Sequence, residues 1–399
     1  MKIAVWILPD YKQQIGGGFA LYDKFIRLID QYEFSPELEV CFVGFNPASN
    51  YQFKKKYIHL NLFGSVPGLK DFAARFSHRI PYFNNKLISI LNEENVSLVF
   101  YPIQGYRKIV NFPFVASNWD IGHKASYAFP ELGMNYSFDY REKWFSRDIF
   151  KALSVFAESE AGKDELMHFT RLFPSRVKIV PLFPGGVVDL KVDKAKQLSL
   201  ISKLNLQEKK YFFYPAQFWA HKNHFNLIKA FEIVANEFPD VKLVLTGSDK
   251  GNKNYIRSVV EKSSLKDRVV FPGFIDNESM VSVYSNAAAM IMPSFLGPTN
   301  MPLMEAQCLN CPVLCSDLPG HREIMMDGAL YFNPADALEM AGQMKKMMND
   351  AIRNELLQKS SQVLKTSVFT PENALKALNK NFLELTPVRN TWGKSDKIF

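Results

Sequence analysis

Short apolar runs alternate along this chain with longer segments of helical period, and this alternation restricts the fold more than any other feature. In the first half, the apolar runs favour strands at residues 3–8, 38–43, 98–101, 114–117 and 153–157. Helical segments are expected after Gly18 and over residues 84–94 and 160–169. Repeated strand–helix units of this kind are typical of a parallel sheet covered by helices. The first half is therefore predicted to be an α/β domain.

The same alternation starts again in the second half of the chain. Strands are expected at residues 211–215, 242–246, 269–271, 289–292 and 312–315, and helices at 223–237, 277–285, 302–309 and across most of 337–385. Prolines and glycines interrupt the pattern around residues 180–186. A chain of 399 residues exceeds the roughly 250–300 that one hydrophobic core supports. We therefore expect two domains, at residues 1–185 and 186–370, followed by a C-terminal helix and tail at 371–399.

Composition narrows the class of protein. A hydrophobic content of 47% with 22% charged residues is typical of a globular protein, and the formal charge of +8 favours anionic partners. A nucleic-acid partner is disfavoured because no recognition motif accompanies the basic charge. The apolar run at the N-terminus is short for a signal peptide, and no apolar stretch approaches the ~18 residues that span a bilayer. We expect a cytoplasmic protein, with peripheral membrane contact as the alternative.

The cysteines do not predict a disulfide framework, because only four occur in so long a chain. Cys308, Cys311 and Cys315 lie close together in sequence, yet a fourth ligand is missing. Structural packing is favoured over metal binding, and no metal or other cofactor is expected.

Polar and glycine residues at the predicted strand exits are the candidates for ligand binding, since open parallel sheets bind ligands at the carboxyl ends of their strands. Gly16, Gly17 and Gly18 follow the first strand and precede a helix, so that their amides suit a phosphate, although a plain flexible turn explains them equally well. Lys222 follows the strand at 211–215 and precedes the helix at 223–237. A lysine there can neutralise a diphosphate leaving group, while the alternative is a solvated surface lysine.

The segment 293–306, PSFLGPTNMPLMEA, is the most informative part of the sequence. A strand ends, a loop with Gly297 and two prolines follows, and a helix is expected to carry Glu305 in its first turn. Such a carboxylate can accept paired hydrogen bonds from ribose hydroxyls, or it can simply complement the helix dipole.

These residues resemble a known family. The string PSFLGPTNMPLMEAQCLNCPVLCSDLPGHREI is similar to the donor-site signature of retaining GT-B glycosyltransferases of family four, in a variant with GPTN in the Glu-x7-Glu motif. The likeness extends over the second half through YPAQFWAHKNHFNLIKAF and LVLTGS. It implies the GT-B fold: two Rossmann-like domains that face each other across a cleft, with a C-terminal helix that crosses back to the first domain.

The resemblance also assigns donor-site residues. It implies that Lys222 meets the diphosphate, that Glu305 holds the ribose, and that Phe274 and Ile275 meet the base. Two residues depart from the family pattern: Gly297 stands in place of the first glutamate and Gln217 in place of an arginine. The remaining donor-site candidates are Gly17, Gly18, Gly247, Thr299, Asn300 and Met301, with Thr299 and Asn300 interpreted as substitutes near the sugar.

The first half resembles the family less closely. Asp120 and His123, with the following Pro130-Glu131, are similar to an Asp-x2-His and Pro-Glu pattern. By this likeness Asp120 and His123 face the donor sugar or the acceptor in the cleft; the alternative is a capping aspartate and a satisfied interior histidine. Ser159-Glu160 is a further candidate at the next strand exit.

The resemblance implies a metal-independent transfer of a hexose, with retention, from a nucleoside-diphosphate sugar to a glycan or lipid-linked acceptor. The subgroup is associated with bacterial surface polysaccharides such as O-antigen and capsule. A catalytically degenerate domain that acts as a binding or scaffold protein is the competing hypothesis, because of Gly297 and Gln217. Lys54, Lys55 and Lys56 either contact anionic headgroups or form an ordinary solvated surface.

Overall fold

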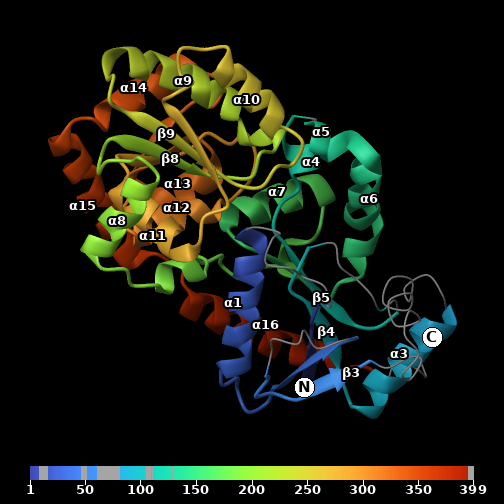
Figure 1. Cartoon of the computed structure of the whole chain (residues 1–399). Helices are drawn as coiled ribbons and strands as arrows, with labels where there is room; N and C mark the ends of the chain where they lie inside the picture. Colours follow the sequence, from blue (N-terminus) through green and yellow to red (C-terminus); the bar gives the residue numbers. More distant parts are fainter. Residues whose placement is uncertain are drawn as a thin grey trace, which may run out of the picture.

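The chain forms two parallel sheets, each covered by helices (Figure 1). This computed structural model describes residues 1–8, 17–45, 52–60, 81–104, 109, 111–127 and 129–393. The first sheet has seven strands in the order β3-β2-β1-β4-β5-β6-β7. Their bounds are β1 (Lys2–Trp6), β2 (Glu39–Gly44), β3 (Tyr57–His59), β4 (Leu98–Tyr101), β5 (Phe114–Asn118), β6 (Ser154–Ala157) and β7 (Val177–Ile179).

The second sheet has six strands in the order β10-β9-β8-β11-β12-β13. Their bounds are β8 (Tyr211–Pro215), β9 (Lys242–Thr246), β10 (Val269–Gly273), β11 (Ala289–Met292), β12 (Val313–Ser316) and β13 (Ala329–Phe332). All strand pairs in both sheets are parallel. We refer to the first sheet with its helices as the first domain and to the second as the second domain.

Helices connect the strands in both domains. In the first domain they are α1 (Gly17–Gln31), α3 (Pro81–Glu93), α4 (Gly122–Ala125), α5 (Pro130–Gly133), α6 (Ser137–Lys143) and α7 (Glu160–Thr170). In the second they are α8 (Lys194–Lys203), α9 (His224–Glu237), α10 (Lys253–Glu261), α11 (Asn277–Asn286), α12 (Met301–Cys308), α13 (Pro319–Met325), α14 (Ala337–Lys346) and α15 (Asp350–Thr366). The last helix is α16 (Pro371–Arg389). Within the described part of the chain, no helix combines the length and apolar character needed to cross a bilayer.

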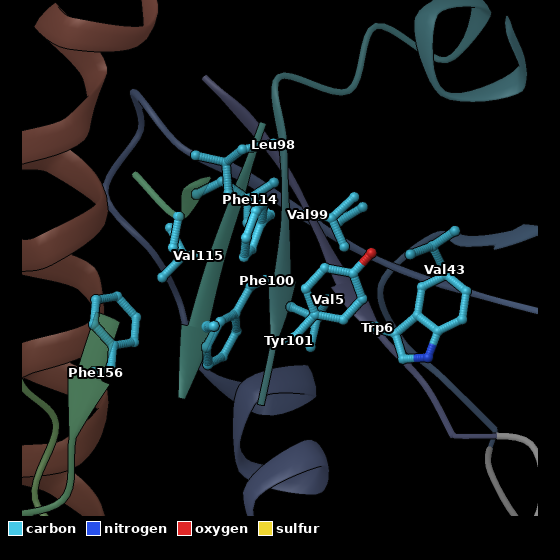
Figure 2. Close-up of a cluster of buried hydrophobic side chains, with 14 of the residues drawn as sticks. Val5, Trp6, Val43, Leu98, Val99, Phe100, Tyr101, Phe114, Val115 and Phe156 are labelled. Atoms are coloured by element: carbon cyan, nitrogen blue, oxygen red, sulfur yellow. The ribbon is translucent and has the colours of Figure 1, made fainter. Parts of the chain in front are cut away.

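Buried aromatic and branched side chains from neighbouring strands make up the core of the first domain (Figure 2). All four residues of β4 are buried, as expected for a central strand that helices cover on both faces. The Phe100 ring lies 5.5 Å from the Phe156 ring of β6, measured between centroids. Continuous apolar runs of this kind are what the sequence showed at the central strands, and the two-domain α/β prediction is confirmed.

The C-terminal helix α16 returns to the first domain, as predicted. Leu378 and Phe382 are fully buried in the core of the first domain, and the Phe382 ring lies 5.7 Å from that of Phe100. At its end, the Arg389 guanidinium donates to the carbonyl of Ser97, 2.6 Å away. The last helix therefore fastens the end of the second domain to the first.

Several elements were not predicted from the sequence. The strands β3 and β7 are three residues long and lie at the two edges of the first sheet, and β13 lies at an edge of the second. The strands β3 and β7 are too short for a pattern to be recognised, and only two of the four residues of β13 are buried. The run of short helical turns over residues 130–151 was also missed, because no single turn is long enough to show a helical period.

Candidate functional site

A cavity of about 400 Å³ lies between the two domains. Its lining residues come from the loop after β5, the α5 and α6 segments, the loop after β8 and the loop after β11: Trp119, Asp120, Glu131, Leu132, Arg141, Trp219, His221, Lys222, Leu296, Gly297, Thr299 and Asn300. The strand-exit loops of both sheets therefore meet at one place, as the topology of open parallel sheets predicts.

Lys222 forms the basic part of the second-domain wall. It ends a short turn between β8 and α9, and its carbonyl accepts a hydrogen bond from the buried Tyr214 hydroxyl, 2.8 Å away. Its ammonium donates to Asn300 Oδ1 at 2.8 Å. Burial lowers the pKa of Lys222 to about 8, while the charges of Asp120 and Glu131 act in the opposite direction. The alternative, a solvated surface lysine, does not describe Lys222.

The side-chain amide of Asn300 forms a hydrogen bond with the buried His321. Its Nδ2 lies 2.8 Å from His321 Nε2, and His321 Nδ1 lies 2.8 Å from the carbonyl of Ser316 at the end of β12. His321 is 0% exposed, and burial lowers its pKa to about 4, so the ring is neutral near pH 7. Three uncharged groups, the Asn300 amide, the His321 ring and the Ser316 carbonyl, are therefore linked in a chain that ends at the Lys222 ammonium.

Gly297 lies in the same loop with a backbone φ of +118°, a conformation that side-chain-bearing residues rarely adopt. A Cβ atom at this position would approach Asn300 Nδ2 to 3.0 Å and Asn300 Oδ1 to 3.4 Å. The backbone conformation at Gly297 therefore favours glycine, and any side chain there would press on the neighbouring amide.

The first-domain wall is built around Arg141 of α6. Its guanidinium donates through Nη2 to Asp120 Oδ1 and through Nε to His123 Nδ1, the latter at 3.1 Å. Asp120 Oδ1 also accepts from the amide of Gly122, 3.0 Å away. Asp120 and Arg141 line the cavity, and the predicted role of Asp120 toward the sugar or the acceptor stays a prediction.

His123 is not among the residues that line the cavity, and its predicted role toward the donor sugar or the acceptor stays a prediction. Its side chain is 0% exposed and packs against the rings of Phe138 and Phe145, with centroids 5.3 and 5.1 Å away. Its Nε2 lies 2.6 Å from Glu142 Oε1. Burial lowers the pKa of His123. The alternative, a satisfied interior histidine, describes it, and its contact with Arg141 connects it to the wall.

Glu131 and His221 join the two walls. Glu131 Oε1 accepts from the His221 amide at 2.9 Å and lies 2.6 Å from His221 Nδ1. Burial acts to raise the pKa of Glu131, but the hydrogen bonds from His221 lower it below its ordinary value.

A second contact between the domains involves Glu323 of α13. Its two carboxylate oxygens accept hydrogen bonds from the backbone amides of Glu160 and Ala161 at the start of α7, each at 2.9 Å. Ser159-Glu160 therefore lies at the junction of the domains.

Glu305 lies outside the cavity lining, in the second turn of α12 and not in the first turn as expected, because the helix already begins at Met301. Its Oε2 accepts from the Tyr284 hydroxyl at 3.1 Å. Burial raises the pKa of Glu305 to about 7, opposed by hydrogen bonds from Tyr284 and the backbone of Gly185. A Cβ on Gly185 would lie 2.8 Å from Glu305 Oε1 and 3.8 Å from Ala20 Cβ, so α12 meets the interdomain segment and the start of α1.

The structure brings five of the predicted site residues into the cavity lining: Asp120, Lys222, Gly297, Thr299 and Asn300. Gly17 and Gly18 begin α1, while Gly16 lies outside the described residues. Met301 begins α12 and packs against both cores. Met301 and Glu305 lie close to Gly185 in the interdomain segment.

Four other predicted donor residues do not line the cavity. Gly247 has a φ of +142° and approaches β8 so closely that a Cβ would lie 2.2 Å from the carbonyl oxygen of Ala216. Phe274 comes directly after β10 and is 88% exposed, and Ile275 follows it. The Gln217 side chain accepts a hydrogen bond from the Trp219 indole at 3.0 Å.

Two lysines of the basic cluster have partners within the protein, and the cysteines are unpaired thiols. The Lys55 ammonium donates to the Tyr32 carbonyl, and Lys56 pairs with Glu94. The cysteines among 308–315 are free thiols, and Cys311 and Cys315 are fully buried in the second core. Among the residues that the structure describes, no group of three or more histidine, cysteine or acidic side chains is gathered around a possible metal position.

Sequence reasoning missed Arg141 and His321. Arg141 lies in a segment without a recognisable period, and nothing in its sequence neighbourhood connects it to Asp120, 21 residues earlier. His321 stood inside the string that carried the family resemblance, as part of PGHREI, but no spacing rule pointed to it.

Residues 197–363 match the family model described as Glycosyl transferases group 1. The chain is similar to that family over this segment. It contains Lys222, Asn300, Glu305 and His321, so the second-domain wall of the cavity lies within the segment that matches the family model.

Solved glycosyltransferases share the fold over nearly the whole chain. The sucrose-phosphate synthase of Thermosynechococcus elongatus superposes with a TM-score of 0.71 at 17% identity, over 97% of this chain and 99% of that one. HepE of Anabaena in complex with UDP-glucose gives 0.69 at 16% identity, over 96% and 100%. The chain has the GT-B fold of these glycosyltransferases.

Curated relatives match over shorter lengths. The O-antigen chain mannosyltransferase RfbU of Salmonella typhimurium is 28% identical over 148 residues, 37% of this chain and 39% of that protein. The O-antigen chain mannosyltransferase B of Escherichia coli is 21% identical over 215 residues, 53% of this chain and 55% of that protein. The matches thus span about two fifths to just over half of these relatives.

Proposed function

We propose that the protein transfers a hexose from a nucleoside-diphosphate sugar to a glycan or lipid-linked acceptor during assembly of a bacterial surface polysaccharide, O-antigen or capsule. One observation carries the proposal: Lys222, whose ammonium donates to Asn300, lines a cavity that both domains form, within a segment that matches the glycosyl transferases group 1 family. The relatives named as O-antigen chain mannosyltransferases support this class of acceptor.

The residues suggest how transfer proceeds. Negative charge develops on the diphosphate as its bond to the sugar breaks, and a preorganised ammonium in a partly buried site stabilises that charge more than water does. Lys222 supplies the ammonium. Glu305 is proposed to accept the ribose hydroxyls, with the first turns of α1 and α12 near the phosphates and Phe274 and Ile275 near the base.

The first-domain wall is proposed to hold the sugar and the acceptor. Asp120, fixed by Arg141, offers a carboxylate oxygen to a hydroxyl group in the cavity. We propose that the acceptor hydroxyl attacks from the face that the diphosphate leaves, so that the anomeric configuration is retained, and that the reaction needs no metal ion.

A nucleotide-sugar panel tests the function. Thermal shift with UDP, GDP, ADP and TDP identifies the base, because a ligand that binds only the native state raises the melting temperature. Transfer is then measured with sugars on that nucleotide, with and without EDTA, and NMR of the product reports the anomeric configuration. Failure of the whole panel to bind would sink the proposal, and an inverted product would remove the retaining mechanism alone.

The competing hypothesis is a binding or scaffold protein that has lost turnover. Gln217 favours it, since its side chain bonds to Trp219 and leaves the cavity without the arginine of the family pattern. Donor binding without transfer or donor hydrolysis would support the scaffold.

Contact with the inner face of the membrane is proposed as the route to a lipid-linked acceptor. Co-sedimentation of the native protein with vesicles of anionic lipid tests it. Lys54→Ala is the informative variant, because the ammonium groups of Lys55 and Lys56 have partners within the protein.

A further inference from the structure

Hydrogen bonds link the Lys222 ammonium through Asn300 and His321 to the Ser316 carbonyl. Only one assignment of donors and acceptors is consistent along this chain. The Ser316 carbonyl can only accept, so the His321 nitrogen that faces it, Nδ1, carries the proton. The ring is neutral, and Nε2 must then accept, which requires the NH₂ group of Asn300 on that side. The amide oxygen of Asn300 is consequently the atom that faces the Lys222 ammonium.

Two glycines make this arrangement possible. A Cβ on Gly320 would lie 1.2 Å from the Pro298 carbonyl oxygen, so α13 can bring His321 this close to the loop only with glycine there. A Cβ on Gly297 would press on the Asn300 amide from the other side. Gly297, which stands where the family pattern has a glutamate, is therefore part of the arrangement that holds Asn300.

The partner of Lys222 is neutral, which matters for an anionic ligand. Among the residues that the structure describes, no carboxylate forms a salt bridge with Lys222, although Asp120 and Glu131 are near enough to favour its charged form. A carboxylate partner would compete with a diphosphate for the ammonium. An amide oxygen orients the ammonium and leaves its charge available.

We propose that His321 is a positioning residue for Lys222, acting through the Asn300 amide to hold the ammonium at the cavity wall, with Gly297 and Gly320 as the steric conditions for this arrangement. The inference rests on the proposed function for its purpose, a diphosphate ligand. The geometry of the chain does not depend on it.

The direct test measures the ionisation of Lys222 in the free protein. Trace acetylation at a series of pH values, read by peptide mass spectrometry, gives the pH at which each lysine becomes reactive, with the exposed Lys203 as internal reference. His321→Phe keeps the volume but removes both ring nitrogens, His321→Gln retains an acceptor and a donor, and Asn300→Leu removes the amide. His168→Phe, at an exposed histidine, is the matched control.

Because a hydrogen bond to the charged form favours that form, we expect Lys222 to become reactive at lower pH in His321→Phe and in Asn300→Leu than in the native protein. His321→Gln should restore most of the native behaviour. The double variant His321→Phe/Asn300→Leu should behave like Asn300→Leu alone, since both changes remove the same contact.

Nucleoside diphosphate binding supplies the second readout. With the diphosphate that the native protein binds best among UDP, GDP, ADP and TDP, we expect His321→Phe and Asn300→Leu to weaken binding at least about tenfold, and His168→Phe to leave it unchanged.

The two readouts separate the two ideas. Native reactivity of Lys222 in a folded His321→Phe protein overturns the positioning role, whatever binds. A shifted reactivity with no diphosphate bound by the native protein supports the positioning role and overturns the proposed function. Should His321→Phe lose its cooperative thermal transition, the comparison of Asn300→Leu with His321→Gln decides: the role requires the first to shift and the second to stay near native.

Discussion

The two walls of the cavity hold their cations in opposite ways. On the second-domain wall, Lys222 is bound by an amide oxygen, and behind that amide stands a neutral histidine. On the first-domain wall, Arg141 is bound by the Asp120 carboxylate and by His123, which in turn contacts Glu142. Among the described residues Lys222 thus has no salt-bridge partner, whereas the charge of Arg141 is matched by Asp120.

This difference indicates a division of tasks. An unmatched ammonium suits a ligand that brings its own negative charge, such as a diphosphate. A matched arginine–carboxylate pair suits hydroxyl groups, to which it presents both donors and acceptors without a net charge. Substitutions in the two walls are therefore expected to differ in their effects on transfer and on diphosphate affinity.

The largest effect is expected for Lys222→Ala. Loss of the ammonium should lower transfer about a thousandfold and remove most diphosphate affinity, since one preorganised group at a developing charge contributes roughly 10²–10³ in rate. Turnover and isothermal titration with the diphosphate are measured. Lys229→Ala, at a half-exposed lysine of α9, is the control. An unchanged diphosphate affinity in Lys222→Ala would contradict the idea that the second-domain wall binds the diphosphate.

Arg141→Ala should have a smaller and different effect. We expect transfer to fall about tenfold to a hundredfold, from the loss of a charged hydrogen bond in the cavity, while diphosphate affinity changes by only a few fold. Arg147→Ala, at an exposed residue of the same segment, is the control. A loss of diphosphate affinity equal to that of Lys222→Ala would mean that both walls bind phosphate and that the division of tasks is wrong.

Glu305→Gln tests the acid that lies outside both walls. Burial raises the pKa of Glu305 to about 7, so the native state binds a proton that the unfolded chain has lost between about pH 4.5 and 7. The stability that this proton contributes is lost as pH rises through that window. The amide cannot ionise, so the variant should gain about 1–2 kcal/mol of unfolding free energy over the native protein at pH 7.

Urea unfolding at pH 4.5 and pH 7 measures this change, and the two proteins should be nearly equal at the lower pH. An equal difference at both values would show that Glu305 is ionised throughout. Transfer by the variant should also fall if the carboxylate holds the ribose, which would distinguish Glu305 from a purely structural acid.

The smallest effect is expected for Glu323→Ala, at the contact between the domains. The start of α7 loses the carboxylate that accepts the amides of Glu160 and Ala161, which costs about 1 kcal/mol, as for a lost helix cap. Chemical denaturation measures it, with the exposed Glu355→Ala as control. A loss of several kcal/mol would show that the walls depend on this contact for their relative position.

The sequence alone predicted the central strands and the strand-exit positions of the site. The strands at residues 98–101, 211–215, 242–246 and 289–292 have the bounds that the apolar runs indicated. Lys222 and Asn300 were expected at strand exits and lie in one cavity. His123 was expected in the cleft and lies in the interior, because spacing fixes where a residue sits on the chain but not which way its ring packs.

The sequence by itself determined local features. It showed which segments are buried strands, and therefore which residues follow the carboxyl ends of those strands at one edge of a sheet. The partners of the reactive groups were decided only by tertiary structure. His321 reaches Asn300 because α13 packs against the 297–300 loop at Gly320, and Arg141 reaches Asp120 because α6 folds back over the loop after β5. These contacts join residues 21 positions apart through the packing of whole elements, which no periodicity along the chain records.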